Sequence, residues 1–199
     1  MKLLKLLSFS AILMTSIGFS QSNTPIYLDA NLPYEVRLDD LMSRMTLQDK
    51  VYQMNQFVGL DHMRQAEKNL TEEELHSNDA QGFYKGLFSD DVAQMTKEGK
   101  IGSFLHVLTT EEANLLQELA LQSPLKIPIL IGIDAIHGNA LVSGTTVYPS
   151  PITLASTWSD SFLYDVGKQS AKEMRATGSH WAFTPNIDVL RDPRWGRVG

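Results

Sequence analysis

The first periodic segment of the chain has the pattern of an amphipathic helix. Its apolar residues recur at the spacing i, i+3, i+4, i+7 and share one helical face: Leu38, Leu41, Met42 and Met45. The residues Thr46-Leu47-Gln48-Asp49 have the form of a capping box, so a second helix is expected to begin here and continue to Val58. Residues 60–90 are polar and lack a steady period, which predicts short helices or an irregular excursion.

From Gly99 onward, apolar runs alternate with amphipathic segments. Strands are predicted at 101–107, 129–133 and 181–188, and helices from Thr110 to Ala120 and from Ser161 to about Thr177. The run Ile129–Ile133 is apolar throughout, as expected of a strand that is buried on both faces. Strands that are separated by helices pair in parallel through βαβ units.

This alternation predicts an α/β protein, the first part of a (β/α)8 TIM-like barrel that is incomplete in this chain. A βαβ unit takes roughly 30 residues and a closed barrel about 250, whereas residues 100–199 supply about three units. We therefore expect the N-terminal fragment of a longer protein.

The N-terminus has the features of a secretory signal peptide. Lys2 and Lys5 precede an apolar run from Leu6 to Phe19, which is shorter than the ~20 residues needed to span a bilayer, and small residues lie before Gln21. The expected organisation is a signal peptide at 1–20, a linker at 21–37 and a barrel domain at 38–199. Because the chain has no cysteine, it has neither disulfides nor a lipidated N-terminal cysteine, which favours a periplasmic or secreted protein without a membrane anchor after cleavage.

The net charge of the chain and the motifs that it lacks argue against several classes of function. The net charge is −6, which argues against nucleic acid or an anionic membrane as a partner. None of the five histidines has metal-ligand spacing, and no dinucleotide, phosphate-loop or serine-hydrolase motif occurs, so we expect no metal and no cofactor.

Two segments carry candidate chemistry. Asp134 follows the strand 129–133 and is followed by His137; a carboxylate there accepts hydrogen bonds from a neutral ligand, binds a cation or caps the next turn. The loop Arg191–Arg197 holds three arginines, Asp192 and Trp195, and either faces a ligand or is braced by its own Arg–Asp pairs. The other tryptophans, Trp158 and Trp181, are expected in the core.

These residues resemble the N-terminal barrel of glycoside hydrolase family 3, of the β-glucosidase and exo-β-glucanase type. The resemblance covers about Leu38 to Gly199, and its most specific blocks are "GIDAIHG" at 132–138 and "RDPRWGR" at 191–197. Further matching blocks are Arg44–Val51, Gly99–Phe104, Thr145–Trp158 and Glu173–Gly178.

The resemblance implies a secreted retaining β-glycosidase that removes terminal non-reducing β-D-glucosyl residues from oligosaccharides or glucosides. Asp134 and Arg197 would hold hydroxyls of that sugar, with Arg194 and His137 as further candidate substrate-binding residues. Arg194 is also expected to brace the loop by pairing with Asp192. Asp188 is expected to contact the substrate-binding residues rather than the sugar itself. The nucleophile Asp and the acid/base Glu are expected downstream, so the fragment alone would be inactive. A β-xylosidase of the same family and a non-catalytic sugar-binding homologue remain alternatives, and an unrelated barrel isomerase is disfavoured because no phosphate-binding loop is in view.

Overall fold

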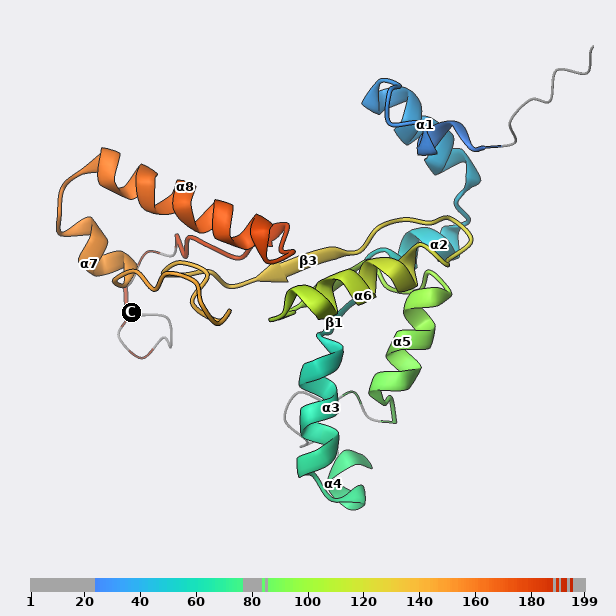
Figure 1. The fold of residues 1–199 in the computed structure, drawn as a ribbon, viewed down its shortest axis with the longest axis horizontal. Coiled ribbons are helices and arrows are strands. Elements are labelled where there is room, and N and C mark those ends of the chain that lie inside the picture. Colours follow the sequence, from blue (N-terminus) through green and yellow to red (C-terminus); the bar gives the residue numbers. More distant parts are fainter. Residues whose placement is uncertain are drawn as a thin grey trace, which may run out of the picture. The chain divides into compact units, whose positions relative to one another are not determined.

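The computed structural model describes residues 24–76, 84, 86–187, 189, 191, 192 and 194, so the predicted signal peptide lies outside the described residues. The chain separates into two compact units, Met1–Met45 and Thr46–Gly199, and each is described by itself. Figure 1 labels helices α1 to α8 and strands β1 and β3. In the described part, every helix is too short or too polar to cross a lipid bilayer.

The first unit consists of the short helix η1 (Ile26–Leu28) and α1 (Tyr34–Arg44). Asp40 joins them, because its carboxylate accepts hydrogen bonds from the Tyr27 N–H and from the Arg44 guanidinium, each at 3.0 Å. The hydrogen bond from Arg44 is the main reason that the pKa of Asp40 is lowered. The helix starts at Tyr34, within the predicted linker, and none of its residues is buried; of the predicted apolar face, Leu38 and Met42 are exposed and Leu41 and Met45 are half-buried.

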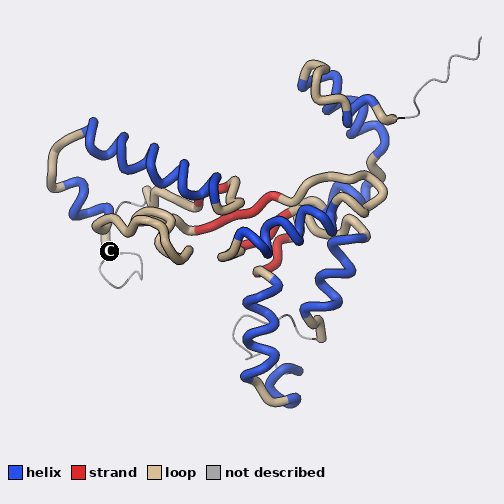
Figure 2. The backbone as a smooth tube through the Cα atoms, viewed as in Figure 1, coloured by secondary structure: helices blue, strands red, loops and turns tan. Residues whose placement is uncertain are grey.

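The second unit is built on one parallel sheet, as predicted. Its strands are β1 (Gln56–Val58), β2 (Ser103–Leu105), β3 (Leu130–Ile133) and β4 (Trp181–Ala182), and they pair in chain order (Figure 2). Each strand is hydrogen-bonded in parallel to the next. The last strand is shorter than predicted, and Asp188 lies outside the described residues.

The prediction of a helix as far as Val58 was wrong. The helix α2 (Leu47–Tyr52) begins at the predicted capping box, with Thr46 and Asp49 exchanging hydrogen bonds, but it ends six residues before Val58. The Asn55 carbonyl accepts from the N–H groups of Gly102 and Ser103, so the chain extends and pairs with β2 instead.

The remaining helices follow the sequence pattern more closely. Among its described residues, the polar segment 60–90 contains two short helices and the start of a third, and the two later amphipathic patterns form helices at the predicted places. These are α3 (Leu60–Asn69), α4 (Glu72–His76), α5 (Ser89–Lys97), α6 (Thr110–Ala120) and α8 (Asp160–Ala176). A further helix, α7 (Pro151–Ala155), was not predicted.

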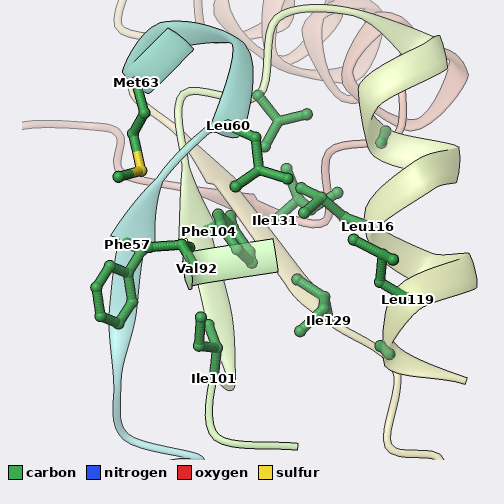
Figure 3. Close-up of a cluster of buried hydrophobic side chains, with 13 residues drawn as sticks. Phe57, Leu60, Met63, Val92, Ile101, Phe104, Leu116, Leu119, Ile129 and Ile131 are labelled. Atoms are coloured by element: carbon green, nitrogen blue, oxygen red, sulfur yellow. The ribbon is translucent and has the colours of Figure 1, made fainter. Parts of the chain in front are cut away.

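The main core lies between the sheet and helices α3, α5 and α6. Phe104 of β2 and Ile131 of β3 are paired in register and fully buried. Figure 3 shows them among side chains from the flanking helices, including Leu60 and Leu116. Ile133, two residues after Ile131, belongs to a second buried cluster with Met174 of α8. Residues i and i+2 of a strand share a face, so a single face of β3 contributes to both clusters.

Glu112 of α6 is a buried carboxylate that caps a different helix. Its side chain accepts a hydrogen bond from the Asp61 N–H at 3.0 Å, in the first turn of α3. The N-cap residue of α3 is Gly59, which has no side chain to do this. A carboxylate suits this position because the first N–H groups of a helix have no partner within the helix. Burial raises the pKa of Glu112 above its ordinary value of 4.5.

We expect Glu112→Ala to lower the free energy of unfolding by about 1–3 kcal/mol, because it leaves buried N–H groups of α3 unpaired. Glu112→Gln retains an oxygen acceptor and should cost less. Since the folded protein favours the protonated carboxyl, the contribution of Glu112 is greatest below pH 4.5 and declines as the pH rises through its higher folded-state pKa.

Urea unfolding between pH 4 and 7 checks both points. The neighbouring exposed carboxylate Glu111 supplies the control, Glu111→Ala, which should change stability little. A stability difference between wild type and Glu112→Gln that stays constant or widens with rising pH would contradict this role of burial.

Candidate functional site

The candidate site lies where β2 and β3 end. Asp134 directly follows β3, and His106 directly follows β2. Because parallel strands end at the same edge of a sheet, the two side chains meet there although they are 28 residues apart: His106 Nε2 lies 2.8 Å from Asp134 Oδ2. Both side chains are partly exposed, at 31% for His106 and 43% for Asp134. Among the described residues, His106 provides the only hydrogen bond to the Asp134 carboxylate.

The sequence analysis did not identify His106. Its backbone is left-handed, with φ of 56°, a conformation that costs a residue with a Cβ roughly 1–2 kcal/mol. Ala135, next to Asp134, is also left-handed, with φ of 45°. The chain therefore bends sharply after both strands, and strain of this kind persists only where surrounding structure holds it. The predicted strand at 101–107 included His106, whereas the observed strand β2 ends at Leu105, so nothing in the sequence indicated that His106 lies at the strand end beside Asp134.

The loop that follows Asp134 is attached to α8. Asn139 is fully buried, and its amide donates to Thr177 Oγ1 at 3.0 Å. Thr146 donates to the Glu173 carboxylate through its N–H at 2.9 Å and its hydroxyl at 2.8 Å. These two bonds hold the pKa of Glu173 below its ordinary value. The long helix thereby fixes the loop that begins at Asp134.

Two glycines of the segment 132–138 lie where another part of the chain comes too close for a side chain. A Cβ at Gly132 would lie 2.5 Å from the ring of Phe183, which follows β4. A Cβ at Gly138 would lie 2.3 Å from the Thr146 carbonyl oxygen, and Gly138 has φ of 85°. The sequence "GIDAIHG" therefore combines one ligand-accessible carboxylate with two positions that tolerate no side chain.

His137 is placed differently from Asp134. Its backbone carbonyl accepts from the Tyr148 N–H at 2.8 Å, which closes the loop. Its Nδ1 atom is buried and has no hydrogen-bond partner among the described residues. No side-chain contact of His137 in this structure therefore supports its predicted role in binding substrate.

The arginine loop is described only in part: Arg197, Trp195 and Asp188 lie outside the described residues. Arg194 donates to the Asp192 carboxylate through both its N–H and its guanidinium. The guanidinium is the main reason that the pKa of Asp192 is lowered. Arg194 is thus hydrogen-bonded to Asp192, and this pair is the bracing arrangement expected for the loop.

Other features of the described chain do not converge on Asp134. An apolar pocket of about 360 Å³ lies between α7, α8 and the residues after β4; Ala135, Ile136 and Gly138 of the loop after Asp134 line it, but Asp134 itself does not. Within the described ranges, no cluster of three His, Asp or Glu side chains is arranged to bind a metal ion. The expectation that Trp158 and Trp181 are in the core was wrong. Trp158 is 94% exposed, in a left-handed turn between α7 and α8, and Trp181 of β4 is 43% exposed.

Residues 46–199 match the family model of the glycosyl hydrolase family 3 N terminal domain. The chain therefore belongs to this family of glycoside hydrolases, whose N-terminal domain is a TIM-like barrel. The parallel sheet, with its candidate site at the C-terminal edge, fits part of such a barrel.

Known relatives of this chain are also glycoside hydrolases. The chain is 29% identical over 161 residues to the periplasmic beta-glucosidase of Salmonella typhimurium, covering 80% of this chain and 17% of that protein. It is 29% identical over 191 residues to the probable beta-glucosidase C of Aspergillus oryzae, covering 92% of this chain and 28% of that protein. The crystal structure of the exo-1,3/1,4-beta-glucanase from a Pseudoalteromonas species matches with a TM-score of 0.60 and 27% identity, over 82% of this chain and 19% of that one. The chain thus spans less than a third of the length of each of these relatives.

Proposed function

We propose that this chain supplies the glycone-binding part of a retaining β-glycosidase that releases terminal, non-reducing β-D-glucosyl residues from oligosaccharides or glucosides. The observation that carries the proposal is the position of Asp134, partly exposed at the C-terminal end of β3 in a chain of this family. Active sites of TIM barrels are built at this end of the strands.

The chemistry of Asp134 suits a neutral, hydroxyl-rich ligand. An ionised carboxylate only accepts hydrogen bonds, so it can bind the O–H groups of a sugar. From the resemblance of its loop to the family, Arg197 is proposed to bind the same sugar, since a guanidinium can donate charge-assisted hydrogen bonds to sugar hydroxyls. Arg194 is assigned to bracing the loop, because it already donates to Asp192.

The two catalytic carboxylates are proposed to lie beyond this chain. Retaining glycosidases use a nucleophile and an acid/base about 5–5.5 Å apart. The relatives above are several times longer than the matched segment, which leaves room for both groups. Secretion or export to the periplasm is proposed from the N-terminal sequence, and it accords with the name of the Salmonella relative.

The test is hydrolysis of 4-nitrophenyl β-D-glucoside by the complete protein, with the first product identified by proton NMR. We expect β-glucose as the initial product, because retention places the water on the face that the leaving group occupied. Initial release of α-glucose would contradict the retaining mechanism, and hydrolysis of no aryl β-glycoside would contradict the enzyme assignment and favour a sugar-binding protein.

A β-xylosidase is the second candidate, and a specific similarity supports it. The chain is 35% identical over 106 residues to the beta-xylosidase of Formosa agariphila, covering 50% of this chain and 15% of that protein. The same assay with 4-nitrophenyl β-D-xyloside separates the two, since a glucosidase should give the higher kcat/KM on the glucoside.

A further inference from the structure

The contact between His106 and Asp134 lies outside the pairing of β2 with β3. The strands β2 and β3 are already joined by their backbone pairing and by the buried side chains of Phe104 and Ile131. The contact lies beyond the last paired residues and both of its side chains reach solvent. It therefore acts on the exposed carboxylate rather than on the core.

The backbone of His106 is held at a fixed place relative to β3. Its N–H donates to the Gly132 carbonyl at 3.0 Å, which continues the ladder between the strands by one residue. On its other side, the Leu105 carbonyl accepts from the Gly59 N–H at 2.9 Å. The left-handed bend at His106 then directs the ring to Asp134.

The direction of the hydrogen bond follows from the chemistry of the partners. An ionised carboxylate can only accept, so Nε2 of His106 carries the proton and donates to Oδ2. Both the Nε2–H neutral tautomer and the cation have this proton, so the bond does not depend on the charge of the ring. Oδ1 of Asp134 has no hydrogen bond from any described residue.

We propose that His106 is a positioning residue for Asp134: its Nε2–H holds one carboxylate oxygen and leaves the other directed to the hydroxyls of the bound sugar. The proposal rests on the proposed role of Asp134 in binding the terminal sugar. A carboxylate held at one oxygen loses less rotamer freedom when it binds, which favours the ligand.

The test is a double-mutant cycle in the complete protein, measured as kcat/KM on 4-nitrophenyl β-D-glucoside. His106→Leu should lower kcat/KM by about 10-fold, the effect of losing one hydrogen bond to a charged group. His106→Gln carries an N–H at the same distance along the side chain and should restore most of the loss. In an Asp134→Ala background, His106→Leu should change kcat/KM by less than about 2-fold, because its partner is gone. His62→Leu, an exposed histidine on α3, is the matched control.

Equal losses from His106→Leu with and without Asp134 would overturn the proposal, as would full activity of the single variant. A measurement that does not need activity separates this proposal from the proposed function. In spectra of protein with nitrogen-15-labelled histidine, His106 should show an Nε2–H resonance that shifts in Asp134→Ala. An unchanged resonance overturns the positioning role even if the enzyme is active. If the resonance shifts but the protein hydrolyses no aryl glycoside, the proposed function is refuted, whereas the hydrogen bond between His106 and Asp134 is supported.

Discussion

The 199-residue chain by itself is expected to hydrolyse no aryl β-glucoside at a measurable rate. Retaining hydrolysis needs two carboxylates, and the resemblance to the family assigns both to positions downstream of this chain. The described sheet also has four strands, with β1 and β4 at its edges, whereas a closed barrel has eight. Unpaired parallel edges and exposed apolar faces favour aggregation, so we also expect poor solution behaviour.

The measurement is release of 4-nitrophenol by the purified chain, compared with the complete protein at equal molarity. An Asp134→Ala version of the same chain is the control for contaminating glycosidases. Turnover that exceeds this control would contradict the assignment of the catalytic carboxylates, and a monomer with a cooperative melt would contradict the expectation of aggregation.

Asp134→Ala in the complete protein is expected to lower kcat/KM by about 10- to 100-fold or more. The substitution removes the charged acceptor of the sugar hydroxyls, and each hydrogen bond to a charged group is worth roughly 1.5–3 kcal/mol. In glycosidases such contacts strengthen toward the transition state, so the loss should appear in kcat/KM rather than in folding. The melting temperature should change little, because the side chain is partly exposed and lies outside both buried clusters.

A turn-capping role for Asp134 predicts the opposite pattern, with a lower melting temperature and near-normal kinetics at low temperature. Asp49, which completes the capping box of α2, provides a matched comparison. Asp49→Ala should lower the melting temperature and leave kcat/KM nearly unchanged, since loss of a cap costs about 1 kcal/mol of stability. An Asp134→Ala protein that behaves like Asp49→Ala would refute the substrate-binding assignment.

Local signals in the sequence predicted the elements that depend on neighbouring residues. The capping box at Thr46 starts α2, and Ser159 caps α8 by accepting from the Phe162 N–H at 3.3 Å. The apolar run before Asp134 forms β3, with Ile131 and Ile133 buried; Leu130 is 42% exposed, so the prediction that the strand is buried on both faces was wrong at this residue. In each case the information lies within a few residues of the element.

The missed features depend on contacts between distant segments. The strand β1 has three residues and exists because Asn55 pairs with Gly102 and Ser103, which lie far along the chain. The partnership of His106 with Asp134 likewise requires that β2 and β3 are neighbours in the sheet. The apolar character of Trp158 suggested burial, but its left-handed turn leaves the ring in solvent.

A crystal structure of the complete protein with glucose bound tests the central claim most directly. The account predicts that glucose lies at the C-terminal edge of the sheet, with Oδ1 of Asp134, the oxygen that His106 leaves free, within about 2.5–3.2 Å of a sugar hydroxyl. It also predicts that His106 remains hydrogen-bonded to the same carboxylate. Glucose bound elsewhere, with Asp134 free of the sugar, would contradict the account.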